Sequence, residues 1–231
     1  MSARLCCGKS TQFLMNFNSF YTTLHYISIF SAVIPFSVAI FKIKTLNQSL
    51  RVLFIYLSVS VITEFASRLL ADSYVKGYYV VQNCFTVLEF LLIALIYYYE
   101  FSSASLKSLI KYLIWSYASI SILAFVLLAN FAEPHSLFST IEACIMIVLS
   151  ITFFYHLHKR LDIPELNNYY FFWINSAILL YFSTSFILFL FDGYLQKCDK
   201  NTFQLLYSLH LLANIAYNTL FSLGIWKFKT K

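Results

Sequence analysis

Several ionisable and amide side chains lie inside long apolar stretches of this sequence, where such groups are costly to place. The clearest case is the stretch 78–99, YYVVQNCFTVLEFLLIALIYYY, which carries Gln82, Asn83, Thr86 and Glu89. On a helix, Gln82, Thr86 and Glu89 share one face, because four and three residues separate them. A carboxyl group in hydrocarbon costs several kcal/mol unless it is protonated, paired or hydrated. The fold therefore has to turn this face inward and give it polar partners.

Similar groups recur at matching positions in the other apolar stretches. With a helical rise of about 1.5 Å per residue, six of them fall roughly 7–12 Å below the outer membrane surface: His25, Glu64, Gln82, Asn83, Glu142 and His210. Glu89 and Asn214 fall near the middle of the bilayer. We interpret these eight residues as candidates for a polar ligand pocket that opens to the outside, with Glu89 and Asn214 as its floor. Hydrogen bonding between helices, without any ligand, is the alternative.

Spacing also suggests specific partners for two of the glutamates. Glu64 and Arg68 are four residues apart, which suits an ion pair on one helix, and His210 is a second candidate partner for Glu64. No fixed positive charge is expected near Glu89, and burial disfavours the ionised form. We therefore expect Glu89 to be protonated at neutral pH and to donate a hydrogen bond to Asn214.

Further expectations concern proline, cysteine and tyrosine. Pro35 lacks a backbone N–H and should kink the first apolar stretch. Cys84 and Cys144 are expected to be small core residues, since no cysteine pair has the spacing of a metal or redox site. The cluster Tyr97–Tyr99 is expected to mark a membrane interface, where aromatic side chains are enriched.

The composition places these residues on membrane-spanning helices. Of 231 residues, 60% are hydrophobic and 11% charged, and the mean hydropathy is +0.73. A soluble domain of this size cannot hide so much apolar surface. Windows of about 20 apolar residues predict seven spans: Ser19–Phe41, Val52–Ala71, Tyr78–Tyr99, Ile110–Asn130, Leu137–Tyr155, Tyr169–Phe191 and Phe203–Trp226. The predicted fold is an all-α, polytopic bundle of seven transmembrane helices over 19–226, with an external tail at 1–18, a short basic cytosolic tail at 227–231 and no soluble enzyme domain.

The basic residues predict the orientation of this bundle. Ten of the 16 lie on one side: Lys42, Lys44, Arg51, Lys107, Lys111, Lys159, Arg160, Lys227, Lys229 and Lys231. The other six are Arg4, Lys9, Arg68, Lys76, Lys197 and Lys200. Because lysine and arginine accumulate in cytoplasmic loops, we expect the N-terminus outside and the C-terminus in the cytosol. The formal charge of +6 is explained by these helix ends and does not indicate a nucleic-acid partner.

The motifs of known seven-helix cofactor proteins are incomplete here. A retinal protein needs a lysine within the last span, where the first lysine is Lys227 at its end. A haem would need His25 and His210 to face each other. The last span has His210-x-x-x-Asn214, which resembles the His-x-x-x-His zinc pair of membrane hydrolases of the alkaline ceramidase and progestin-receptor type, but one ligand is missing. We predict no metal and no cofactor, and assign no catalytic residue.

Three features together resemble a further family: the glutamate in the third span, the run FFWINSAILLYFS and the segment HLLANIAYNTLF. The chain is similar here to small seven-helix membrane proteins of Bacteroidetes that have no assigned activity. This resemblance implies a multi-pass protein of a bacterial inner membrane, surrounded by lipid. For the function, a sensor or small-ligand-binding protein that acts through a cytosolic or membrane signalling partner fits best. A membrane-embedded hydrolase, possibly metal-dependent, and an ion- or proton-conducting protein remain as alternatives, so enzymatic activity stays open.

The orientation can be tested with reporter fusions. Reporters placed after Leu46, Leu106 or Lys231 should behave as cytosolic, because these positions lie on the side with ten basic residues. Reporters placed near Ser73, Glu133 or Asp199 should behave as external. A cytosolic signal from a fusion near Glu133 would contradict the seven-span arrangement.

Overall fold

Helices form the whole of the secondary structure that the computed structural model describes. It describes residues 19–71, 74–127, 136–159, 166–195 and 197–228, and these contain no strand. The predicted external tail 1–18 and residues 229–231 lie outside the described residues. The helices are residues 19–31, α2 (Val33–Lys42), η1 (Ile43–Thr45), α3 (Gln48–Ala71), α4 (Val75–Glu100), α5 (Ala104–Leu127), α6 (Ser136–Lys159), η2 (Leu166–Asn168), α7 (Tyr170–Leu190), α8 (Asp192–Leu195) and α9 (Lys200–Lys227).

Six of these segments are long and apolar enough to cross a bilayer, so this is a multi-pass membrane protein. They are Ser19–Thr45, Gln48–Leu70, Gly77–Glu100, Ala104–Phe125, Leu137–Lys159 and Tyr170–Leu190. The last long helix, α9, has 28 residues but is more polar than these six. Its sequence carries Gln204, His210, Asn214 and Asn218 between its apolar residues, and much of that polar surface faces its neighbours in the bundle.

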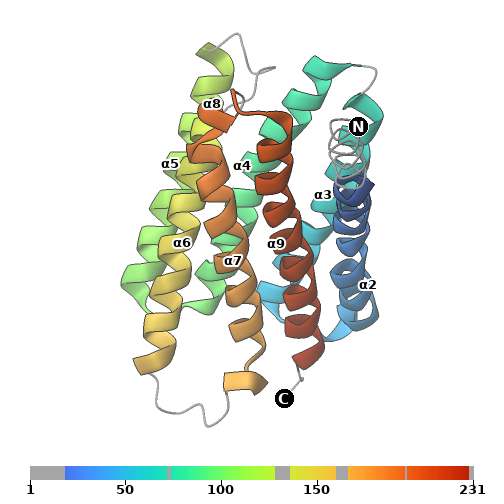
Figure 1. The fold of residues 1–231 in the computed structure, drawn as a ribbon. Helices are drawn as coiled ribbons and strands as arrows, with labels where there is room; N and C mark the ends of the chain where they lie inside the picture. The colour runs from blue at the N-terminus through green and yellow to red at the C-terminus, as the bar shows by residue number, and fades with distance from the viewer. Residues whose placement is uncertain (1–18, 72–73, 128–135, 160–165, 196, 229–231) are drawn as a thin grey trace, which may run out of the picture.

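The long helices run alternately up and down the bundle (Figure 1). α3 packs on α4, α7 lies between α6 and α9, and α2 packs on both α9 and α3. α5 packs mainly on α4 and is the least buried of the six apolar spans, so it is the most peripheral of them. The short helix α8 lies at the top of Figure 1, and η1, η2 and the end of α9 lie at the bottom.

A lysine fixes the ends of α2 and α9 to each other. The Nζ atom of Lys42 donates hydrogen bonds to the backbone carbonyls of Ile225, Trp226 and Phe228. The last carbonyls of a helix have no partner within it and carry partial negative charge, so a lysine is well suited to this position. The two helices therefore end on the same side of the bundle.

Polar side chains tie the lower half of the bundle together. Tyr97 of α4 donates to Oδ1 of Asn175 on α7, and the Asn175 side chain donates to the Ser150 carbonyl of α6. Nearby, the Glu100 carboxylate accepts hydrogen bonds from Ser49, Tyr169 and Tyr170. Apolar side chains with almost no exposure fill the space between these groups: Phe90, Ile93, Phe171, Ile174 and Phe221. This half of the bundle is closed.

The structure decides the expectations for proline, cysteine and tyrosine. The first apolar helix is interrupted at Ala32, three residues before Pro35, but the Ala32 backbone keeps helical angles (φ −65°, ψ −24°), so the kink at Pro35 stays a prediction. Cys84 and Cys144 are exposed, so the prediction that they are core residues was wrong. They lie on outward faces of α4 and α6, where their small size is not needed for packing. Tyr97 is fully buried because its hydroxyl bonds Asn175, whereas Tyr99 is 39% exposed.

Close contact of α7 and α9 depends on Gly224. A Cβ atom there would lie 2.7 Å from Cγ1 of Ile174 and 3.0 Å from the Tyr170 carbonyl oxygen. We expect Gly224→Ala to lower the free energy of unfolding by about 1–3 kcal/mol, because the buried Ile174 has no space to move. Gly193→Ala is the matched control, since a Cβ atom there meets nothing within 4 Å. Thermal unfolding of both variants in detergent measures the difference, and equal melting temperatures would show that the helices separate at little cost.

Candidate functional site

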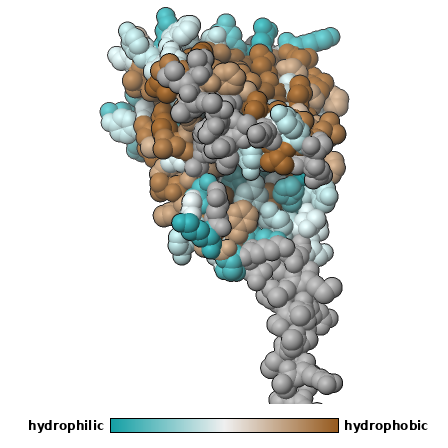
Figure 2. All heavy atoms as spheres, turned by 90° about the horizontal axis from the view of Figure 1, so that it is seen from above, coloured by the Kyte–Doolittle hydropathy of each residue, from teal (hydrophilic) through white to brown (hydrophobic). Residues whose placement is uncertain are grey.

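A cavity of about 640 Å³ lies in the upper half of the bundle. Its lining reaches from Tyr78, Tyr79 and Asp192, near the end of the bundle that carries α8, down to Tyr56 and Glu89. Seven of the eight candidate residues line it: His25, Glu64, Gln82, Asn83, Glu89, His210 and Asn214. Figure 2 looks down on this end and shows hydrophilic side chains set between hydrophobic ones, beside the grey residues. The sequence prediction grouped these seven residues by their depth along the helices, and in the structure they line one cavity.

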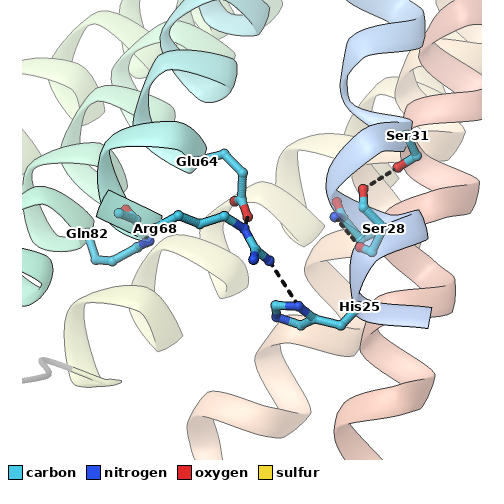
Figure 3. Close-up of polar contacts among 8 residues, drawn as sticks. His25, Ser28, Ser31, Glu64, Arg68 and Gln82 are labelled. Carbon is cyan, nitrogen blue, oxygen red and sulfur yellow. Dashed lines mark hydrogen bonds and ion pairs between the residues drawn. The ribbon is translucent and has the colours of Figure 1, made fainter. Parts of the chain in front are cut away.

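An arginine crosses the upper part of the cavity. Figure 3 shows Arg68 extending from α3 toward His25 on the helix of residues 19–31. One terminal nitrogen of Arg68 lies 3.0 Å from Nδ1 of His25, and its Nε lies 3.8 Å from the Glu64 carboxylate. The predicted Glu64–Arg68 ion pair is therefore confirmed. Because a guanidinium only donates, Nδ1 of His25 is the acceptor and the ring proton is on Nε2.

Amide side chains of α9 hold the helix of residues 19–31 in place. Nδ2 of Asn214 donates to the Ser28 hydroxyl at 2.9 Å, and Nδ2 of Asn218 donates to the Ser31 hydroxyl at 2.8 Å. Across the cavity, Nε2 of Gln82 donates to the Ser67 hydroxyl at 2.9 Å and joins α4 to α3. These bonds occupy part of the polar lining, so some candidate residues also connect helices.

The floor of the cavity is a chain of hydroxyl groups that ends on Glu89. The Tyr217 hydroxyl donates to the Tyr56 hydroxyl at 2.9 Å, and Tyr56 donates to Oε1 of Glu89 at 2.8 Å. The prediction that Glu89 bonds Asn214 was wrong, because the Asn214 amide is directed to Ser28 instead. The rotation of α9 about its axis, which the sequence does not define, decides this pairing. Glu89 is an acceptor in the hydrogen bond seen here.

Glu142 is the candidate residue that does not line the cavity. It is buried on α6, with 3% of its surface exposed, and its Oε1 atom has no hydrogen-bond partner among the described residues. Ser139, one turn earlier on the same helix, does line the cavity. Glu142 therefore lies just behind the cavity wall, on a helix that packs against α4, which carries Glu89.

Tyrosines form a large part of the lining, and sequence reasoning assigned them no role there. Tyr56, Tyr78, Tyr79, Tyr181, Tyr207 and Tyr217 all line the cavity. Tyr56 could have been found, because Tyr56, Ser60 and Glu64 recur at intervals of four residues and so share one face of α3. The ring of His210 packs against Tyr181 and Tyr207, with centroid distances of 5.3 and 5.8 Å.

No family model, curated protein or solved structure matches this chain. Among the described residues, no three His, Cys, Asp or Glu side chains gather in an arrangement that would hold a metal ion. The chemistry of the site therefore has to be inferred from its own groups. They are one guanidinium, buried or half-buried carboxyl groups, two imidazoles, amides and several phenols, all of which bind polar solutes by charge and hydrogen bonding.

The bridge made by Arg68 can be tested by stability. Arg68→Ala leaves Glu64 without its ionic partner and His25 without its donor. Both ends of the pair are partly exposed, at 36% and 40%. The loss should therefore lie between that of a surface pair and a buried pair, at about 1–2 kcal/mol of unfolding free energy. Lys107→Ala, which removes a cation over the Tyr98 ring, is the control and should change stability by less. Thermal unfolding that gave equal losses would mean that Arg68 contributes nothing beyond packing.

Proposed function

We propose that this protein is a seven-span membrane protein with an external N-terminus that binds a small polar ligand in the cavity from the outside. In this proposal the ligand changes the relative position of helices, and a separate cytosolic or membrane partner reads the change. The cavity itself carries the proposal. A volume of about 640 Å³ lies within the size range of small-molecule sites, and its charged groups lie inside an apolar bundle, where they are seldom retained for packing alone.

Two observations support the proposed topology. The helix of residues 19–31 with α2, and α9, end on the same side, as expected for an odd number of crossings. α9 has 28 residues, which at about 1.5 Å per residue is longer than a bilayer is thick. Its lower hydropathy is consistent with a spanning helix whose polar face lines a cavity and bonds its neighbours. With this topology, the mouth of the cavity faces the outside and the side rich in lysine and arginine faces the cytosol.

The charges of the cavity suggest how a ligand would act. A ligand with an anionic group would compete with Glu64 and His25 for Arg68, since arginine binds carboxylates and phosphates in a fork-like geometry. Release of His25 would remove the link between α3 and the helix of residues 19–31. That helix is also bonded to α9 through Ser28 and Ser31. Its movement would therefore shift α9 and change the cytosolic side of the bundle.

A proton-conducting protein is the second candidate, and the chain Tyr217–Tyr56–Glu89 is the observation that favours it. Below Glu89, however, the bundle is filled by the buried side chains of Ile93, Ile174 and Phe221. This apolar layer separates the chain from the next polar group, Tyr97. The geometry therefore favours ligand binding over conduction.

Access to the cavity can be tested by cysteine labelling. In a variant without native cysteines, Ser60→Cys places a thiol in the cavity lining. Ser119→Cys places one on the exposed face of α5, which faces lipid in this proposal. A charged, membrane-impermeant methanethiosulfonate added outside should modify the thiol at position 60 more than about tenfold faster, because the reactive thiolate requires water. Equal rates, or labelling of position 60 only from the cytosolic side, would contradict an outward-facing cavity.

Binding can then be tested with defined solutes. A panel of carboxylates, phosphates, amines and amino acids is added to the purified protein, and thermal stability is measured. A true ligand at about 100 times its Kd should raise the unfolding free energy by about 2.7 kcal/mol. The increase should disappear in Ser60→Trp, which fills the cavity, and should weaken in Arg68→Ala. An increase that survives both substitutions would place the binding elsewhere.

A further inference from the structure

Two carboxyl groups are buried on the neighbouring helices α4 and α6, and neither forms an ion pair with a described lysine or arginine. Glu89 on α4 is 6% exposed and Glu142 on α6 is 3% exposed. Tyr117 of α5 lies between their helices: its ring centroid is 3.9 Å from that of Phe90, next to Glu89 on α4, and 6.5 Å from that of Phe138, one turn from Glu142 on α6. Among the described residues, the glutamate that forms an ion pair is Glu64, with Arg68. Ionising a buried acid without an opposite charge is costly, so two of them on neighbouring helices are not both ionised unless something positive lies between them.

Every helix around this pair contributes a hydroxyl group rather than a charge. Tyr56 of α3 donates to Glu89. Tyr181 of α7 and Tyr217 of α9 line the cavity together with Glu89, and Tyr117 of α5 stacks on Phe90, the residue after Glu89. The nearest basic side chain from α9 is His210, whose ring packs on Tyr181. The environment thus contains many oxygen atoms, and no ion pair joins either carboxyl group to a lysine or arginine among the described residues.

Several of these oxygen atoms have no hydrogen-bond partner in the described part of the chain. They are Oε1 of Glu142, the hydroxyl of Tyr117 and the hydroxyl of Ser121, which lies one turn from Tyr117 on α5. All three side chains are more than nine-tenths buried. Leaving a buried polar atom unsatisfied costs about 1–3 kcal/mol, so three of them on α5 and α6, which both pack on α4, point to a bound species that supplies the missing interactions.

The cavity provides a route to this place. Its lining includes Glu89 and also Ser139, which lies one turn from Glu142 on α6. A small solute that enters from the cavity therefore needs to pass only the wall formed at this level by α4 and α6. Oxygen atoms of carboxylates, hydroxyls and water are the ligands of hard cations.

We propose that Glu89 and Glu142, together with the hydroxyl of Tyr117, form a binding site for a monovalent cation of the size of sodium. With one carboxyl group ionised, the other protonated and one cation bound, the site carries no net charge, which is the condition for a site in hydrocarbon. Ser121 and water complete the coordination. A divalent ion would require both groups to be ionised and a richer set of carboxylates than these two. This inference is independent of any ligand in the cavity above.

The test is the effect of sodium on stability. Purified protein is unfolded thermally in sodium chloride or choline chloride at equal ionic strength and pH, without other solutes. Sodium should raise the melting temperature in a saturable manner, and the increase should be absent in Glu142→Gln and in Glu89→Gln. Glu100→Gln, a glutamate at the opposite end of the bundle, is the control. Its baseline melting temperature can fall, but its sodium-dependent increase should equal that of the unmodified protein.

A second variant keeps the test decisive if the glutamine variants do not fold. Tyr117→Phe retains the ring stacked on Phe90, 3.9 Å between centroids, and removes only the hydroxyl. It should need several-fold more sodium for half of the stabilisation. Equal melting temperatures in sodium and choline would overturn the proposal and leave protons and water as the occupants. A sodium effect that survives in Tyr117→Phe and both glutamine variants would place the ion elsewhere, and a larger effect of calcium would refute a monovalent site.

Discussion

Hydrocarbon offers no hydrogen bonds, and this constraint governs the arrangement of polar side chains throughout the bundle. In the lower half each buried polar group finds a partner on another helix. Tyr97, Asn175 and Ser150 connect α4, α7 and α6, and the Glu100 carboxylate gathers hydroxyl groups from α3 and α7. The upper half meets the same constraint only in part, because space remains between α3, α4 and α9. The difference between the two halves separates a structural region from a candidate binding region.

The helices and their order could be predicted because the hydrophobic pattern of a membrane span is a strong and local signal. This hydrophobic signal was weakest for the last helix. α9 was predicted from the same kind of window, but it carries enough amide and imidazole groups to be less apolar than the other six segments. Depth along a helix is also a local property. Depth predicted that His25, Glu64 and His210 lie at the same level, and in the structure they line one cavity.

The rotation of each helix about its axis is not a local property, and the failed predictions all depend on it. Asn214 was expected to meet Glu89, but α9 is turned so that Asn214 meets Ser28 and Tyr217 faces Tyr56. Glu142 has the same depth as the cavity and is turned behind its wall. Cys84 is turned outward. Such rotations are set by packing between several helices at once, as at Gly224 against Ile174, and no single segment of the sequence contains that information.

The break at Ala32 divides the first transmembrane segment into two parts with different mechanical roles. The lower part, α2, is anchored, because Lys42 binds the carbonyls that end α9. The upper part, residues 19–31, contacts α3 at the level of the cavity through the bridge from Arg68 to His25. The two parts therefore bond α9 at different levels: Lys42 meets its last carbonyls, whereas Ser28 and Ser31 accept from the amides of Asn214 and Asn218.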